Sequence, residues 1–224
     1  MKITYYGHAC IGIEVKGIHI VVDPFISGNP KASHINMDNI KANYILLTHA
    51  HQDHSLDAEA LAWKNGATII SNAEIADYYS RKGISTHPMN HGGSWKFDFG
   101  RLKYVNAIHS SSFADGTYGG NPAGFVLEAD KNIYIAGDTA LSFDMKLIPL
   151  RTKLDLVVLP IGDNFTMDIK DAIIASDFVE CNHILGYHFD TFGFIEIDSN
   201  EAVKEFALKG KNLTLLDIGS SLEL

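Results

Sequence analysis

The segment from Thr48 to His54 constrains this chain more than any other, because it holds three imidazoles and one carboxylate within six residues. Imidazoles that lie close together repel each other when protonated, whereas neutral imidazoles are good metal ligands. A surface loop that is rich in histidine by chance is the alternative interpretation. The density of ligand-type side chains favours a metal site.

The spacing within this segment predicts two groups of ligands. His49, His51 and Asp53 alternate, so in an extended segment they point to the same side, and His54 falls on the other side. One loop can therefore serve two adjacent ions, with His49 and His51 at one ion and Asp53 and His54 at the other.

The flanking residues predict that this segment connects a strand to a helix. Tyr44–Leu47 is typical of a buried strand, and Ser55–Lys64 is typical of a helix that is capped by Ser55 and ends near Gly66. Loops at the carboxyl ends of strands are where α/β proteins usually carry their sites.

The remainder of the chain has the patterns of further strands and helices. Residues 11–22 and 94–108 predict two β-hairpins, which turn at Lys16-Gly17 and near Gly100. Strands are also expected at 67–70, 124–128, 132–136, 155–159, 183–187 and 213–216, and helices at 72–82, 166–181 and 199–210, the second of them capped by Thr166.

The two halves of the chain resemble each other. Gly17–Asp23 is similar to Asn132–Asp138, and in each half a strand that ends in Asp precedes an apolar strand, a functional-looking loop and a helix. We therefore expect an α/β protein, an αββα sandwich of two mixed sheets flanked by helices, with residues 1–224 forming one domain of two similar βα halves.

Composition limits the classes of partner. The net charge is −9, from 27 acidic and 18 basic residues, and there is no basic run, which argues against nucleic acid as a substrate. No segment is apolar for long enough to span a bilayer, so we expect no membrane partner and a cytoplasmic location. Cys10 and Cys181 lie far apart without a CxxC motif and are expected in the core, not in a disulfide or a thiolate zinc site.

Four more candidate site residues follow predicted strands, namely His109, Asp138, Asp163 and His188. Each of them alone is more often a turn residue or an ordinary surface or core group. Together with the histidine-rich segment they supply what two ions need, with His49, His51 and His109 at one ion, Asp53, His54 and His188 at the other, and Asp138 able to bridge both.

At this point the sequence resembles the metallo-β-lactamase superfamily of dinuclear hydrolases, whose H-x-H-x-D-H motif stands here as His49 to His54. The resemblance covers essentially the whole chain and implies the αββα sandwich, with His109, Asp138 and His188 as the remaining ligands. More narrowly, five segments look like the small metal-dependent hydrolase branch akin to the ascorbate-6-phosphate lactonase: Gly7-His8, Asp23–Phe25, Gly137–Thr139, Pro160–Met167 and His188–Phe192. Asp190 and Gly193 stand where that branch has Asn and Pro.

Asp53 indicates the type of chemistry. Redox members of the superfamily, which hold a di-iron site, resemble the pattern His-x-Glu-x-Asp, so the Asp53-His54 pair favours hydrolysis. In a two-metal site with ions roughly 3.5 to 4 Å apart, a bridging water ionises near neutral pH and attacks a polarised carbonyl or phosphoryl group. We expect two divalent ions, most readily zinc, with manganese, iron or nickel as alternatives, and Asp53 as a ligand that can also accept a proton.

Other residues have less certain roles. His8, Asp23 and Asp163 are candidates to contact substrate or to hydrogen-bond a ligand's imidazole. Four further histidines, His34, His87, His91 and His183, are not expected to be ligands, and Trp63 and Trp95 are expected in the core. The loops 27–41 and 115–122 are expected to border the substrate pocket because they are long and rich in glycine or other loop-forming residues.

The sequence thus predicts a dinuclear hydrolase in which a metal-bridging hydroxide cleaves a small ester, lactone or phosphoester. A metal-holding sensor without turnover and a redox di-iron protein are the alternatives. The expected partner is a small molecule, and a homo-oligomer is the usual default for a soluble enzyme.

Overall fold

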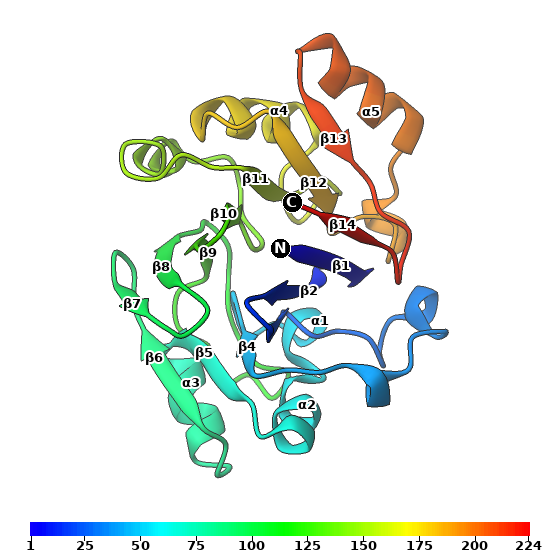
Figure 1. Cartoon of the computed structure of the whole chain (residues 1–224). Helices are drawn as coiled ribbons and strands as arrows, with labels where there is room; N and C mark the ends of the chain where they lie inside the picture. Colours follow the sequence, from blue (N-terminus) through cyan, green and yellow to red (C-terminus); the bar gives the residue numbers. More distant parts are fainter.

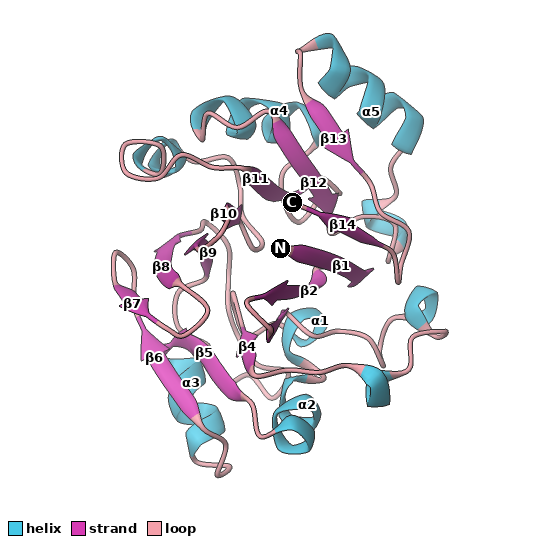
Figure 2. Cartoon of the chain, in the orientation of Figure 1, coloured by secondary structure: helices cyan, strands magenta, loops and turns pink.

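Two seven-stranded mixed sheets lie face to face between two layers of helices in the computed structural model, which describes residues 1–224 (Figure 1). The helices α1 (Gln52–Ser55), α2 (Ala58–Asn65) and α3 (Ala73–Ser80) lie on one side, and α4 (Ile169–Phe178) and α5 (Ser199–Leu208) lie on the other, as Figure 2 shows. The predicted αββα sandwich is confirmed. None of these helices combines the length and the apolar character that crossing a bilayer requires.

The two sheets have the same sequence of strand pairings. The first has the order β14 (Ser221–Glu223), β1 (Lys2–Gly7), β2 (Cys10–Val15), β3 (Ile18–Val22), β4 (Tyr44–Leu46), β5 (Thr68–Asn72) and β6 (Thr86–Met89). The second has the order β7 (Ser94–Lys96), β8 (Arg101–Asn106), β9 (Ala123–Glu128), β10 (Asn132–Ile135), β11 (Leu156–Pro160), β12 (His183–Tyr187) and β13 (Asn212–Thr214). In the first sheet the strands from β14 to β3 pair antiparallel, and those from β3 to β6 pair parallel. In the second sheet the strands from β7 to β10 pair antiparallel, and those from β10 to β13 pair parallel.

This pairing gathers strand ends that carry polar residues. Strands β3 and β4 run parallel in the first sheet, and β10, β11 and β12 run parallel in the second. The carboxyl ends of parallel strands meet at one edge of a sheet. The residues that follow β3, β4, β10 and β12 therefore lie near one another.

Alternation along the strands explains the core. Ile20 and Val22 of β3 face the second sheet, whereas Val21 between them packs toward the helices. Ile133 and Ile135 of β10, in the second sheet, face the first sheet. The sandwich thus has an apolar layer between its sheets and one under each helical layer. Both cysteines are buried and unpaired, as predicted.

Two predicted helix starts are wrong. Helix α2 begins at Ala58, because the Ser55 hydroxyl donates to the carbonyls of Ala50 and His51 and closes the short α1 turn instead. Helix α4 begins at Ile169, where the Asp168 carboxylate accepts from the Asp171 amide at 2.7 Å.

Two further expectations from the sequence need correction. Trp63 and Trp95 lie on the surface with 59% and 56% of their side chains exposed, because Trp63 is on the outer side of α2 and Trp95 is on the edge strand β7. The strands β6 and β14 have no counterpart among the predicted elements. Both are short, and Pro88 lies within β6.

Candidate metal centre

Seven polar side chains converge at one edge of the sandwich. Four of them lie in the loop after β4 and in the α1 turn, namely His49, His51, Asp53 and His54. The other three follow strands of the second sheet, namely His109, Asp138 and His188. These are the residues that the sequence singled out as candidate ligands.

Asp138 lies at the middle of this cluster. Its Oδ2 atom is 3.0 Å from His188 Nε2, 3.3 Å from His54 Nε2 and 3.5 Å from His109 Nε2. Gly137 makes this position possible, since its φ is 68° and a Cβ there would approach the Ala123 carbonyl to 2.7 Å. One carboxylate thus faces imidazoles from three different parts of the chain.

The nitrogen and oxygen atoms form two groups on either side of Asp138. His49, His51 and His109 offer atoms within 4.8 Å of one another, and His49 Nε2 is 3.0 Å from His51 Nδ1. Asp53, His54 and His188, together with His8, form the second group. Each group has enough donors for one ion.

Asp23, at the end of β3, determines which ring nitrogens of His49 and His54 are free to bind a metal. Its Oδ2 accepts from His54 Nδ1 at 2.9 Å and from the Thr48 hydroxyl at 2.6 Å. Because the Thr48 proton goes to this carboxylate, the Thr48 oxygen accepts from His49 Nδ1 at 3.0 Å. For a neutral ring this leaves the Nε2 lone pair of both His49 and His54 directed into the cluster.

His8, after β1, holds the Asp53 carboxylate. Its Nε2 donates to Asp53 Oδ2 at 3.0 Å, and its Nδ1 is 3.0 Å from the Thr191 hydroxyl. Burial is the main cause that lowers the pKa of His8 to about 4, so the ring is neutral near pH 7. A neutral ring that donates from Nε2 accepts at Nδ1, so Thr191 is the donor there.

The electrostatics of the cluster favour an ionised Asp138 and a neutral His49. Burial raises the pKa of Asp138, but His188 and His54 outweigh it and hold that pKa well below its usual value. Burial lowers the pKa of His49 well below its usual value. His54 differs, because Asp138 and Asp23 overcome burial and raise its pKa.

Several buried atoms of the cluster make no hydrogen bond of regular geometry, although two of the nitrogens lie 3.0 and 3.3 Å from Asp138 Oδ2. They are His54 Nε2, Asp138 Oδ1, His188 Nδ1 and His188 Nε2. Leaving a buried polar group unpaired costs about 1 to 3 kcal/mol. A divalent cation among these atoms removes that cost for the atoms that ligate it, and imidazole with carboxylate is a donor set that such ions accept. The residues therefore fit a metal site.

A cavity of about 660 Å³ opens over the cluster. Five of the candidate ligands line it, with Ser110, and Phe165, Phe192, Gly193 and Phe194 complete its wall. No lysine or arginine lines it. The cavity is therefore acidic and histidine-rich at its floor and aromatic at its wall.

The two loops that were expected to border this cavity do not line it. Ala32 and Ile40, in the loop 27–41, pack into the apolar layer under the first helices. The loop 115–122 is held against α3, where Asn72 Nδ2 donates to the carbonyls of Gly119 and Asn121. Both loops therefore pack against the layer formed by α1, α2 and α3 and not against the cavity.

Other residues named from the sequence lie outside the cluster. Asp163 does not line the cavity, and its carboxylate accepts from the next amide, that of Asn164, at 2.6 Å. Asp190 takes a left-handed conformation with φ of 59°, which Asn and Asp tolerate. Five histidines are absent from every group of potential ligands, namely His19 and the four that were not expected to be ligands, His34, His87, His91 and His183.

Sequence reasoning missed residues that contact the cluster. Ser110 Oγ lies 3.3 Å from His51 Nε2, and Thr48 and Thr191 fix the rings of His49 and His8. Each of these three residues lies close to a candidate ligand in sequence, and this closeness was the only indication in the sequence that they contact the cluster. Phe165 and Phe192 of the cavity wall also lie close to the candidates Asp163 and His188 in sequence.

Comparison with known proteins agrees with the geometry. Residues 2–188 match the family described as the beta-lactamase superfamily domain. The chain is 70% identical to a metal-dependent hydrolase of Flavobacterium johnsoniae, over 100% of both chains. It is also similar to Igni18, a metallo hydrolase of Ignicoccus hospitalis, with 32% identity, a TM-score of 0.90 and coverage of 100% of this chain and 98% of that one. An isothiocyanate hydrolase from Delia radicum gut bacteria has the same fold, at 18% identity and a TM-score of 0.79, with 100% of this chain and 99% of that one covered.

Proposed function

This chain belongs to the metallo-β-lactamase superfamily and is a metal-dependent hydrolase, and from that premise we propose that it uses two divalent ions to hydrolyse a small apolar ester or lactone. The observation that carries the proposal is the set of buried, unpartnered ligand atoms around Asp138 below an aromatic cavity. The reaction takes place in the cytoplasm on a small-molecule substrate, and the enzyme acts without nucleic acid or membrane.

The proposed ligands divide as the geometry groups them. His49, His51 and His109 hold one ion. Asp53, His54 and His188 hold the other, and Asp138 joins the two groups. When bound, zinc or a similar divalent ion supplies Lewis-acid charge that acidifies a water molecule and polarises the scissile bond.

The side chains of this protein supply orientation and a proton site. Asp23 and Thr48 hold the rings of His49 and His54 with their Nε2 atoms inward. Asp53, which lines the cavity, accepts the proton of the attacking water, and His8 keeps its carboxylate in place through the 3.0 Å hydrogen bond.

The cavity wall favours an uncharged, apolar substrate. Phe165 and Phe194 are 50% and 77% exposed, and their ring centroids are 6.4 Å apart. Exposed aromatic rings gain most from covering an apolar group. A phosphorylated sugar needs cationic or other donor groups for its phosphate beyond the metal ions, and no lysine or arginine lines this cavity. Carboxylic esters and lactones therefore fit better than phosphomonoesters.

A metal-removal experiment tests the proposed chemistry. Protein treated with a chelator should lose hydrolysis of p-nitrophenyl hexanoate and regain it with zinc or manganese, because the cluster has no other strong electrophile. Elemental analysis should give two ions per chain after reconstitution. Hydrolysis that survives complete metal removal would overturn the proposal, and so would saturation at a single ion.

A further inference from the structure

A second cavity lies on the outer face of the second sheet. Its volume is about 320 Å³, and it shares no lining residue with the cavity over the candidate metal centre. Val105, Val126 and Tyr134, from three neighbouring strands, form one wall, and Met145 and Ile148 form the other. Most of this lining is apolar, and a mostly apolar cavity of this size is typical of small-ligand sites.

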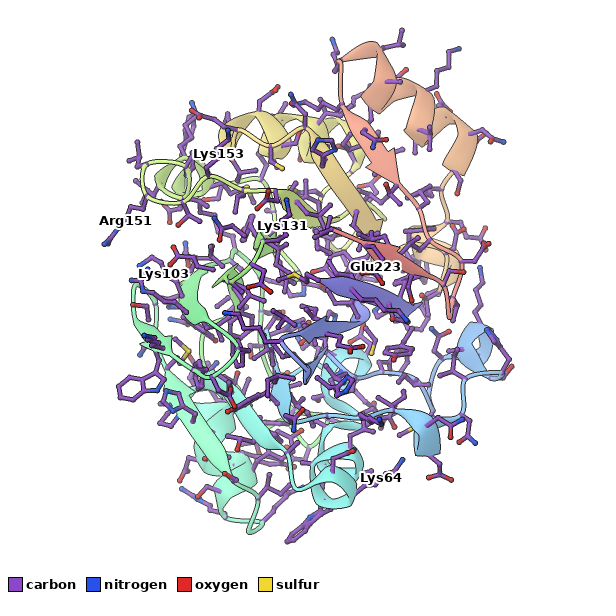
Figure 3. The ribbon with its side chains drawn as sticks, in the orientation of Figure 1. Lys64, Lys103, Lys131, Arg151, Lys153 and Glu223 are labelled. Carbon is purple, nitrogen blue, oxygen red and sulfur yellow. The ribbon has the colours of Figure 1, made fainter.

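Two basic side chains that form no ion pair line the same cavity. Lys103 donates to the Gly92 carbonyl at 2.9 Å, and Arg151 is exposed; neither forms an ion pair. Figure 3 shows both of them at one edge of the molecule. Burial, followed by the nearby Arg151 and Arg101, lowers the pKa of Lys103.

The other polar groups of the lining are less available or already paired. The Asp144 carboxylate accepts from Asn106 Nδ2 at 2.7 Å, and the Thr152 hydroxyl donates to Glu128. The Tyr134 hydroxyl is buried and has no partner. The Tyr134 ring is fully covered, so the groups that can meet a ligand are the Lys103 and Arg151 cations and the Asp144 carboxylate, beside an apolar wall.

We propose that this cavity binds a small amphiphilic carboxylate, such as a medium-chain fatty acid. Its carboxylate lies between Lys103 and Arg151, since a guanidinium holds a carboxylate with two parallel hydrogen bonds. Its chain covers Val105, Val126 and Met145, and each buried methylene contributes about 0.8 kcal/mol. Inorganic phosphate matches the cations alone and leaves the apolar wall uncovered. A second copy of this chain does not explain a cavity walled on two sides.

Calorimetric titration of the zinc-loaded protein with octanoate tests this proposal. Octanoate should bind with one-to-one stoichiometry, and octanamide, which has the same chain without the charge, should bind at least about tenfold more weakly. Inorganic phosphate should bind more weakly than octanoate. Absence of octanoate binding up to millimolar concentration would overturn the proposal, and so would equal affinity for octanamide.

Substitutions locate the bound octanoate. The double variant Lys103→Gln/Arg151→Gln should lose at least about tenfold in affinity, whereas Lys64→Gln, far from the cavity in Figure 3, should bind as the wild type does. Unchanged affinity in the double variant would mean that octanoate binds the metal ions instead, and would refute the site. If the double variant unfolds, Arg151→Gln alone changes an exposed side chain and gives the same comparison.

Discussion

At Asp23, one buried carboxylate sets the protonation of two imidazoles. It accepts from His54 Nδ1 directly and reaches His49 Nδ1 through the Thr48 hydroxyl. Both rings then offer Nε2 to a metal. Groups that orient metal ligands in this way commonly affect metal affinity or activity by about 10- to 100-fold.

The variant Asp23→Asn should therefore bind zinc about 10- to 100-fold more weakly, because both carboxylate oxygens accept hydrogen bonds, Oδ1 from the Thr48 amide and Oδ2 from His54 and the Thr48 hydroxyl, and an NH₂ group cannot replace either oxygen. Competition with a fluorescent chelator measures this affinity. The matched control is Asp57→Asn, another buried aspartate, which accepts from the amides of Ile26 and Ser27 and should lose stability without losing metal affinity. Equal zinc affinity in wild type and Asp23→Asn would contradict this role.

Asp138→Asn tests the bridging carboxylate. The substitution keeps the shape but removes a negative charge among three imidazoles, so turnover should fall at least about 10- to 100-fold and metal content should drop. Metal analysis and ester hydrolysis on the same sample check both. A variant that melts lower yet keeps two ions and normal turnover would make Asp138 a turn residue only.

The candidate ligands could be predicted from the sequence because each follows a strand pattern that local residues determine. The hydrogen-bond partners Ser110 and Thr191 could not, since Ser and Thr occur in most loops and their contacts depend on how His51 and His8 are placed in three dimensions.

Among the elements, the hairpins could be predicted from alternation and the buried strands from apolar runs, whereas the boundaries of the helices and the wall of the cavity could not. Helix α2 was expected to start at Ser55, but that hydroxyl is used by the α1 turn. Strand β14 pairs only with β1, from the opposite end of the chain, and no local pattern reveals such a partner. The cavity wall was assigned to long loops, although a phenylalanine before α4 and the segment that follows β12 form it.

The wall segments around Phe165 and Phe194 should determine substrate preference. Phe194→Ala should lower kcat/KM for p-nitrophenyl hexanoate about tenfold, as expected for about 1.5 kcal/mol of lost apolar contact, and should leave p-nitrophenyl acetate almost unchanged. Leu208→Ala is the control, since Leu208 is similarly exposed at 68% on α5 and lies outside the cavity. A uniform loss on both esters would argue against contact with the longer acyl chain.

In the molecule as a whole, the two ends of the chain meet. The Leu224 amide donates to the Met1 carbonyl at 2.9 Å, and β14 pairs with β1 between them. A circular permutant that joins Leu224 to Met1 through a short glycine linker and opens at Asp115-Gly116, in an exposed turn, should fold and bind metal.

Circular dichroism and metal content of that permutant check the expectation. The control inserts three glycines at the same turn in the natural order, so damage caused by opening the turn is measured separately. An unfolded permutant beside a folded insertion variant would show that the contact between the termini does not tolerate a covalent link.

The pairing of β14 with β1 also orders events during synthesis on the ribosome. Strand β1 is made long before β14, so its outer edge stays without a partner until Ser221–Glu223 emerge. Exposed strand edges invite pairing with other chains. His188 is the last candidate ligand to be translated, so a nascent chain that stalls before it has neither a closed sheet nor a complete ligand set. Products that stop before His188 should therefore aggregate and appear as metal-free material, and complete metal loading should begin only after His188 has been translated.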